Sequence, residues 1–284
     1  MMAAQRTFGR RRVGRLTNVT LYLVLVLGAL TMITPLLWMV VTSLKPLEDV
    51  FKWPPLAFQS APVWENYREI WRAVPFGRYL ANTFLVSTAR TAGVLVTSSL
   101  AGYAFARLRF PGRDAIFLAY LGTIMVPGQV TMIPSFIVMR ELGWLDTYMA
   151  LIVPWLFSPF GTFLMRQYFL TLPRSLEDAA AIDGAGLLTA FRRIALPLAK
   201  PALATLAVFT FLTSWNDFLW PLIVTDSREV RVVSVGLTEF QDLYYTDWPL
   251  LMAASLVAVV PVLVLYMFAQ RYFVAGIATT GMRG

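Results

Sequence analysis

The sequence contains no cysteine and no histidine, and it has few charged residues. Disulfides, thiol chemistry, the usual zinc sites and catalysis by histidine are therefore excluded for this chain. Only 14% of its 284 residues are charged and 58% are hydrophobic, against roughly a quarter and a half in soluble domains. The chain also lacks a G-x-x-x-x-G-K-[ST] phosphate loop and any polar segment long enough for a nucleotide-binding domain. We therefore expect an all-α integral membrane protein that is not itself an enzyme, with no catalytic, metal-binding or cofactor-binding residues.

Six apolar stretches are long enough to cross a hydrocarbon core about 30 Å thick, which takes about 20 helical residues. They lie near residues 18–44, 80–106, 115–138, 148–170, 198–224 and 249–270. The first exceeds the apolar core of a signal peptide, about 7 to 15 residues, and no small-residue cleavage site follows it, so we expect it to be retained. Five spans contain prolines, which are common in membrane helices. Because each proline frees a carbonyl that needs a partner, their number favours a bundle that moves or lines a path.

Basic residues are unevenly distributed among the segments that connect these spans. With the N-terminus inside, fifteen of the 24 lysines and arginines fall in inner segments and eight in outer ones. Since basic loops stay on the cytoplasmic side, both termini are expected in the cytoplasm. The net charge of +8 is spread over the inner loops, so membrane lipid rather than nucleic acid is the expected partner of these charges.

The break between the fourth and fifth spans has an unusual composition. It reads LEDAAAIDGAGLLTAFRRIALPLAKP from Leu176 to Pro201. Ser175 followed by Asp178 fits a capping box, which predicts a short helix that begins near Leu176. Gly184 lies where a helix end takes a residue with positive φ, and apolar residues then recur at helical spacing on one side of a second short helix. The recurring residues are Leu187, Leu188, Phe191, Ile194 and Ala195, with Arg192 and Arg193 on the other side.

Small and acidic side chains gather on the first of these two short helices. Alanines allow another surface to approach closely, and carboxylates can meet basic groups on that surface. The alternative is an amphipathic loop that only lies on lipid, which the acidic residues disfavour because the inner leaflet is negative. The residues expected to contact a partner are Glu177, Asp178, Ala179, Ala180 and Asp183.

This stretch resembles the cytoplasmic coupling loop of ATP-binding-cassette importer permeases. That loop has the pattern E-A-A, three residues, G, nine residues, I, one residue, L-P. Asp178, Ala179 and Ala180 occupy the E-A-A positions here, so the carboxylate is one methylene shorter. The remaining matches are Gly184, Ile194, Leu196 and Pro197. The stretches NTF at Asn82, AGYAFARLRFPGR from Ala101, SWNDFLWPLI from Ser214 and RYFVAGIATTGMRG from Arg271 are similar to the smaller permease subunit of maltose- and glycerol-phosphate-type importers.

The resemblance implies a fold, a location and partners. It implies six transmembrane helices of the type I ABC importer permease fold in a bacterial or archaeal plasma membrane. The implied parts are residues 1–78, a core at 79–272 with a coupling loop at 172–197, and a cytoplasmic tail at 273–284. The implied partners are a second homologous permease subunit, two copies of an ATPase subunit that bind ATP and magnesium, and an extracytoplasmic solute-binding protein. The coupling loop would dock into a groove of the ATPase, and the tail from Arg271 to Gly284 is a candidate second contact.

Charged and polar residues at membrane depth mark candidate positions on a solute path. A charge near the bilayer centre costs on the order of 3 kcal/mol on insertion scales and usually faces the bundle interior. Arg90 and Asp217 lie at similar depths, so we expect that they pair or that one faces the path. The alternative is that either reaches the interface or a local carbonyl. The candidate path residues are Asn82, Arg90, Gln129, Trp155, Trp215, Asn216 and Asp217.

Three functions remain open from the sequence. The leading one is a permease subunit of an ATP-driven, binding-protein-dependent importer of oligosaccharides or related polyols, because amide, carboxylate and aromatic groups suit a sugar. A glycerol-3-phosphate importer is the alternative, since Arg90 could serve an anion. An ion-driven secondary transporter would also use proline-broken spans, but it needs titratable residues near the midplane and leaves the docking pattern unexplained.

Overall fold

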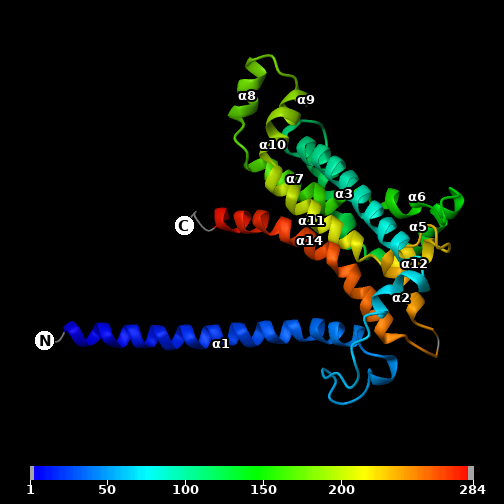
Figure 1. The fold of residues 1–284 in the computed structure, drawn as a ribbon. Helices are drawn as coiled ribbons and strands as arrows, with labels where there is room; N and C mark the ends of the chain where they lie inside the picture. Colours follow the sequence, from blue (N-terminus) through cyan, green and yellow to red (C-terminus); the bar gives the residue numbers. More distant parts are fainter. Residues whose placement is uncertain (1–2, 243, 281–284) are drawn as a thin grey trace. The chain divides into compact units, whose positions relative to one another are not determined.

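The computed structural model describes residues 3–242 and 244–280, with side chains described for 18–242, 244–268 and 270. These residues form helices and turns, and no β-sheet occurs among them (Figure 1). The α-helices are α1 (Ala3–Ser43), α2 (Asn66–Ala73), α3 (Phe76–Arg107), α4 (Arg113–Gly122), α5 (Gly128–Glu141), α6 (Tyr148–Ile152), α7 (Pro159–Thr171), α8 (Ser175–Ile182), α9 (Leu187–Ala190), α10 (Leu196–Leu198), α11 (Lys200–Trp215), α12 (Leu219–Val224), α13 (Val233–Gly236) and α14 (Trp248–Thr280). Shorter turns are η1 (Leu47–Asp49), η2 (Thr123–Met125), η3 (Val153–Trp155), the π-helical η4 (Phe191–Ala195) and η5 (Leu237–Phe240).

Three helices are long and apolar enough to cross a membrane on their own. They are Asn18–Ser43, Phe76–Arg107 and Trp248–Phe268, and they coincide with the first, second and sixth predicted spans. Three more stretches reach that length only as pairs of helices joined at a sharp bend. The bends are 99° between Arg113–Met125 and Gly128–Glu141, 41° between Tyr148–Trp155 and Pro159–Thr171, and 75° between Leu187–Leu198 and Lys200–Trp215.

The expectation of one continuous span over residues 198–224 is wrong. α11 ends at Trp215, and α12 begins only at Leu219. The intervening residues leave the helix, and Asn216 is the C-cap of α11, with φ −91° and ψ 3°. The polar sequence Asn216–Asp217 explains the break, because short polar side chains compete with helical backbone hydrogen bonds.

Prolines explain two of the other breaks. Val126, which precedes Pro127, is extended, as expected because a proline disfavours the helical conformation of the residue before it. Pro159 opens α7, where its missing N–H costs nothing. The side chain of Ser158 caps the same helix by accepting a hydrogen bond from the Gly161 nitrogen at 2.9 Å. Prolines at 35, 134 and 261 lie inside α1, α5 and α14 without ending them.

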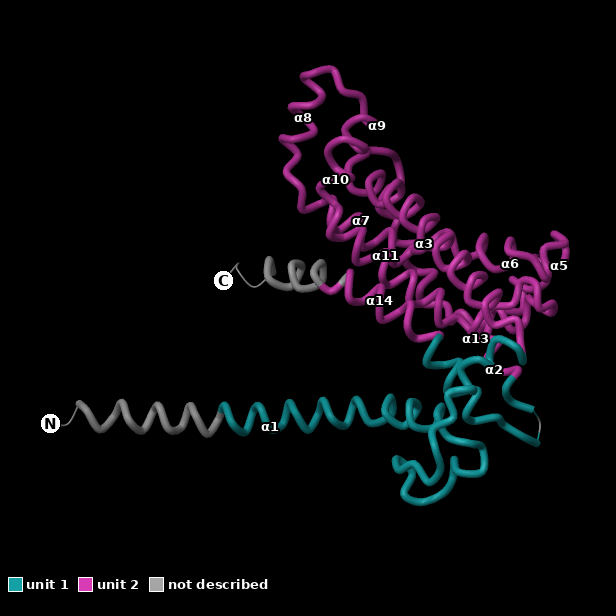
Figure 2. Tube along the Cα trace, viewed as in Figure 1, with its two compact units in different colours: residues 1–73, 240–257 teal, residues 74–239, 258–284 magenta. Residues whose placement is uncertain are grey.

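The chain divides into two compact units, which Figure 2 colours separately. Unit 1 contains residues 1–73 and 240–257, and unit 2 contains 74–239 and 258–284. In unit 1, α2 is tied to the end of α1, because the side-chain amide of Asn66 donates to the carbonyls of Ser43 and Lys45 at 2.9 and 3.2 Å. This helix was not predicted from the sequence. The described part of α1 in the span Asn18–Ser43 presents apolar side chains outward along its length, as lipid contact requires.

Unit 2 is built on α3, which packs along α7 and α11 (Figure 1). Glycine allows the closest approach, since a Cβ added at Gly102 would lie 2.9 Å from the backbone nitrogen of Arg166. Small residues commonly have this role between membrane helices. Toward one end of α3, the ring of Tyr103 packs edge-on against Phe169 at 5.5 Å between centroids and lies 5.0 Å from Phe191. The bundle therefore has a well-packed core on one side of the polar site described next.

Candidate solute path and coupling segment

A buried ion pair joins α3 to the chain just after α11. Nη1 of Arg90 lies 2.8 Å from Oδ2 of Asp217, and the two side chains are 5% and 20% exposed. Arg90 is held further by a hydrogen bond of 2.6 Å from its Nε to the carbonyl of Leu151. Its guanidinium also lies 5.5 Å from the ring centre of Trp155, within range of a cation–π contact. Of the two predicted arrangements, the structure thus shows the pairing of Arg90 with Asp217.

Two cavities lie beside this pair, with volumes of about 520 and 320 Å³. Trp155 and Asp217 line both of them, Arg90 lines the larger one and Gln129 lines the smaller one. Four of the seven predicted path residues, Arg90, Gln129, Trp155 and Asp217, thus line one or both of two adjacent cavities. The ring of Trp155 meets Trp220 edge-on at 6.2 Å between centroids, which fixes its orientation between the two cavities.

Three other predicted path residues line neither cavity. Asn82 lies near the N-terminal end of α3 and donates hydrogen bonds to backbone carbonyls. Trp215 is buried and donates from Nε1 to the carbonyl of Ala258 at 3.2 Å. The side-chain amide of Asn216, the residue after α11, donates to the carbonyl of Leu212 in the last turn of that helix at 2.9 Å. Sequence position alone could not separate these residues from the cavity residues, because all of them are polar or aromatic at a similar depth.

Sequence reasoning missed part of the cavity wall on α11. Thr210, Thr213 and Ser214 line the larger cavity together with Asp217. They recur every three or four residues, which places them on one face of the helix. This periodicity of hydroxyl residues in an apolar helix was available as a signal. The open side of the same cavity is aromatic, with Phe157, Phe160 and Phe209 at 67%, 50% and 49% exposure.

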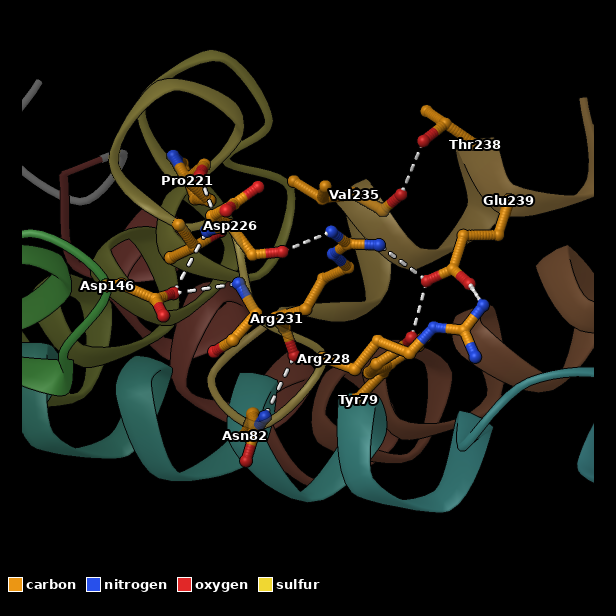
Figure 3. A network of polar contacts seen from close by, with 12 residues as sticks. Tyr79, Asn82, Asp146, Pro221, Asp226, Arg228, Arg231, Val235, Thr238 and Glu239 are labelled. Carbon is orange, nitrogen blue, oxygen red and sulfur yellow. Dashed lines mark hydrogen bonds and ion pairs between the residues drawn. The ribbon is translucent and has the colours of Figure 1, made fainter. Parts of the chain in front are cut away.

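A second polar network fixes the loop between α12 and η5 onto the start of α3 (Figure 3). Glu239 is its centre, because its carboxylate accepts from Nη2 of Arg228 at 2.6 Å, from Nη1 of Arg231 at 2.7 Å and from the hydroxyl of Tyr79. Burial acts to raise the pKa of Glu239, but the hydrogen bonds from Tyr79 and Arg231 and the two positive charges outweigh it, so this pKa lies below its usual value. The side-chain amide of Asn82 adds two bonds of 2.9 Å, to the carbonyls of Glu229 and Arg231.

Asp146 holds the other end of this loop (Figure 3). Its Oδ1 accepts from the backbone nitrogens of Asp226 and Ser227 at 2.9 and 3.0 Å. Burial acts to raise its pKa, but these backbone donors lower the pKa of Asp146 below its usual value. Asp146 has a φ of +56°, a conformation that Asp adopts more readily than most residues. The side chains of Asn82 and Asp146 therefore hold the backbone of residues 226–231 in place through hydrogen bonds.

The predicted coupling segment forms a helical hairpin. α8 begins at Ser175, one residue before the predicted start. Gly184 ends it with a φ of +81°. The nitrogen of Gly184 donates to the carbonyl of Ala181 at 3.0 Å, and that of Ala185 donates to the carbonyl of Ala180 at 2.8 Å. These two bonds form a Schellman motif, which confirms the reading of Gly184 as a helix end.

Two details of this segment differ from the prediction. Ser175 is not the N-cap, because α8 includes it, Arg174 occupies the cap position and no side chain caps the helix. The second helix does not bury a single apolar side. Phe191 and Ala195 are buried, whereas Leu187 and Leu188 are 65% and 63% exposed. Figure 1 shows α8 and α9 projecting past the ends of α3 and α7, which is consistent with the exposure of Leu187 and Leu188.

Glu177 is engaged inside the chain. Its Oε1 lies 3.2 Å from Nε of Arg107, and the side chains are 19% and 5% exposed. Nη2 of Arg107 also donates to the carbonyl of Leu172 at 2.7 Å. The ion pair therefore anchors α8 to the end of α3. The surface left for a partner consists of Asp178, Ala179, Asp183 and Gly184, which are exposed, with Leu176 and Ile182 exposed at 42% and 87%. Ala180, Ile194 and Leu196 are half-buried, and Pro197 is exposed.

The candidate contact of the tail, from Arg271 to Gly284, lies outside the residues whose side chains the structure describes.

A bundle of bent apolar helices with cavities beside a buried ion pair, continuous with an exposed helical hairpin, is typical of solute permeases that a separate subunit drives. The family described as "Binding-protein-dependent transport system inner membrane component" matches residues 93–279. The chain belongs to this family, and it is an all-helical membrane permease subunit of the type I ABC importer fold, not itself an enzyme.

Individual relatives have similar lengths to this chain. It is 35% identical over 264 residues to the sn-glycerol-3-phosphate transport system permease protein UgpE of Yersinia pestis, which covers 90% of this chain and 94% of the relative. It is 36% identical over 253 residues to the arabinooligosaccharides transport system permease protein AraQ of Halalkalibacterium halodurans, which covers 88% and 91%. Among solved structures, a chain of a bacterial ABC transporter involved in the import of the acidic polysaccharide alginate matches with a TM-score of 0.83 and 25% identity, covering 92% of this chain and 98% of that one.

Proposed function

We propose that this chain is a permease subunit of an ATP-driven, binding-protein-dependent importer of oligosaccharides or related polyols. The observation that carries the proposal is the exposed α8–α9 hairpin, which runs through α10 and a 75° bend directly into α11. A hairpin outside the bundle is suited to receive motion from a partner, and a continuous helical connection is suited to pass it inward as a rigid body. The proposed partners are a second homologous permease, two copies of an ATPase that bind ATP and magnesium, and an extracytoplasmic solute-binding protein.

The proposed topology has six spans and both termini in the cytoplasm. Three continuous apolar helices and three bent pairs support the count, and the concentration of basic residues in alternate segments supports the orientation. Residues 1–78 would form the N-terminus, first span and outer loop, 79–272 the core with the coupling loop at 172–197, and 273–284 a cytoplasmic tail. Membrane lipid is the proposed neighbour of the inner basic residues.

The proposed docking surface is the exposed side of α8 and its glycine turn. Asp178 and Asp183 offer carboxylates, and Ala179 offers little bulk. Leu176 and Ile182 add apolar side chains that water otherwise surrounds. Glu177 has a different role, because its ion pair with Arg107 holds α8 in place.

The proposed solute path passes Gln129, Trp155 and Asp217. Aromatic faces and hydrogen-bonding groups in one cavity fit a sugar, and the relative AraQ is named for arabinooligosaccharides. The second candidate solute is sn-glycerol 3-phosphate, which the relative UgpE is named for. Arg90 is the cation beside the cavity that this candidate would need.

Purification of the intact complex tests the proposal. We expect a tagged chain to co-purify with an ATPase and a second permease, and we expect solute-loaded binding protein to raise vanadate-sensitive ATP hydrolysis in proteoliposomes. Uptake driven by an ion gradient alone, with no recoverable ATPase, would show that the proposal is wrong. Thermal-shift screening of the cognate binding protein identifies the solute, because a bound ligand stabilises the folded state.

A further inference from the structure

The two charged groups beside the cavities differ in their access to a solute. The Arg90 side chain is 5% exposed, and its remaining nitrogen, Nη2, is enclosed without a hydrogen-bond partner. Asp217 is 20% exposed and lines both cavities. A solute in either cavity therefore meets the carboxylate first and finds the guanidinium behind it.

The site as a whole carries no net charge. Of the described residues that line the two cavities, only Arg90 and Asp217 are charged, and they neutralise each other at 2.8 Å. A phosphate or carboxylate entering this space would lose water without gaining a cation, which is costly in a partly buried site. It would also approach a carboxylate of the same sign. The guanidinium of Arg90 is thus not available to bind an anionic solute while it is paired with Asp217.

The same surface suits hydroxyl groups. A carboxylate accepts short, strong hydrogen bonds from neutral donors, and the open position of Asp217 between the cavities makes it available to both. Trp155 is 44% exposed and presents an aromatic surface beside it. The hydroxyls of Thr210 and Thr213 lie along the larger cavity, and Gln129 supplies an amide in the smaller one.

We infer that the two cavities form one site for a neutral, polyhydroxylated solute and reject phosphates and uronates of the same size. In this site Asp217 binds hydroxyls and Trp155 packs on the solute ring. Arg90 is a positioning residue that holds the Asp217 carboxylate in place. The inference rests on the proposed function, and it selects the sugar or polyol over sn-glycerol 3-phosphate as the transported class.

Binding of neutral and anionic probes to the intact importer in nanodiscs, without its binding protein, tests directly whether the site prefers neutral solutes. Saturation-transfer-difference NMR detects weak binding, and two matched probe pairs differ in charge: galactotriose with trigalacturonate, and glycerol with sn-glycerol 3-phosphate. We expect galactotriose and glycerol to give signals at least about tenfold stronger than their anionic counterparts, the factor for loss of about one hydrogen bond to a charged group. Equal signals within each pair, stronger anion signals, or no signal from any probe would overturn the inference.

Two variants assign the selectivity to the ion pair. Asp217→Asn leaves Arg90 unbalanced, so we expect the preference within each pair to reverse. Arg90→Gln combined with Asp217→Asn restores neutrality, so we expect anions to be rejected again while galactotriose binds more weakly than to the wild type. Glu141→Gln removes an exposed carboxylate on α5 and is the matched control. If the single variant does not assemble, the wild-type comparison and the neutral double variant still decide the matter. An unchanged preference in Asp217→Asn would refute the role of the pair.

These outcomes separate the inference from the proposed function. An importer whose ATP hydrolysis responds to loaded binding protein, but whose permease cavity binds the anionic probes, retains the proposed function and loses the inference. An importer without any ATPase partner loses both.

Discussion

The contact between α3 and α7 makes Gly102→Ala a sharp test of the packing. An added Cβ would lie 2.7 Å from Cβ of Met165, 2.9 Å from the backbone nitrogen of Arg166 and 3.1 Å from the carbonyl carbon of Met165. These atoms belong to the α7 backbone or are attached directly to it, so rotation of a side chain cannot relieve the contact. Because carbon atoms pack best at about 3.5–4.0 Å, the two helices must separate by roughly 1 Å.

The expected cost follows from two opposing effects. Overpacking a well-packed core costs about 1–3 kcal/mol, while replacing glycine by alanine inside a helix returns roughly 0.5–1 kcal/mol. We therefore expect Gly102→Ala to lower the free energy of unfolding by about 1–2 kcal/mol. Gly161→Ala should cost less, because its Cβ would meet only side-chain atoms of Ser98, Leu206 and Ser158. Gly122→Ala should be neutral or stabilising, because nothing lies within 4 Å of its Cβ.

The assay is unfolding of the purified chain in mixed micelles of increasing denaturing detergent, followed by tryptophan fluorescence. The order of midpoints expected is Gly122→Ala at or above the wild type, then Gly161→Ala, then Gly102→Ala. A Gly102→Ala midpoint equal to that of Gly122→Ala would refute the close approach of α3 and α7.

Three further predictions concern the two ends of the bundle. The pKa of Glu239 lies below its usual value of about 4.5. The stability that its carboxylate contributes is therefore present above about pH 4.5 and is lost as the pH falls through the lowered pKa of the folded state. Glu239→Gln should remove this acid dependence in the same unfolding assay. Asn82→Leu removes two hydrogen bonds and leaves the Glu229 carbonyl with only the 3.4 Å bond from the Tyr148 hydroxyl. An unpaired buried carbonyl costs about 1–3 kcal/mol, so the variant should speed hydrogen exchange at residues 226–233 without a change at α11. Gly184→Val strains the positive φ, and we expect it, like Asp178→Lys, to abolish ATPase co-purification while membrane insertion stays normal. Gly186→Val is the control, because Gly186 has an extended backbone, and it should leave co-purification intact. Equal recovery of the ATPase in all three variants would contradict the docking role.

The local features of the coupling segment were predictable from the sequence because short-range chemistry determines them. The helix ends at Gly184 through bonds from the nitrogens of Gly184 and Ala185 to carbonyls three and five residues earlier, so this role is visible in the local sequence. The capping box failed because Arg174 begins the helical conformation one residue early, and helix boundaries depend on small energy differences. The proline positions likewise indicated where spans break, but not the 99° or 41° angles, which depend on packing.

Long-range contacts account for what the sequence could not reveal. Glu177 was expected to face a partner, yet it pairs with Arg107, which lies 70 positions earlier in the chain. Asn82 was expected on the solute path, yet its amide binds carbonyls near residue 230. A polar residue in a membrane helix must find a partner, but composition does not say whether that partner is a solute, a loop or an ion. The pair of Arg90 and Asp217 was predictable because few charges share that depth.

The arrangement of polar contacts along α3 gives the proposed coupling a physical route. Near its N-terminal end α3 carries Tyr79 and Asn82 of the loop network, then Arg90 beside the cavity, and at its C-terminal end Arg107, which anchors α8. Its 32 residues span about 48 Å at about 1.5 Å per residue. The second partner of Arg90, Asp217, lies two residues past α11, the helix that continues from the hairpin. Motion of the hairpin would therefore reach the two sides of the ion pair by different helices. α11 joins the hairpin through a bend, whereas α3 meets this segment through the ion pair of Arg107 with Glu177 and the ring contact of Tyr103 with Phe191. Because the two helices are linked to the hairpin differently, we expect them to move unequally and so to alter the contact of Arg90 with Asp217 beside the proposed solute site.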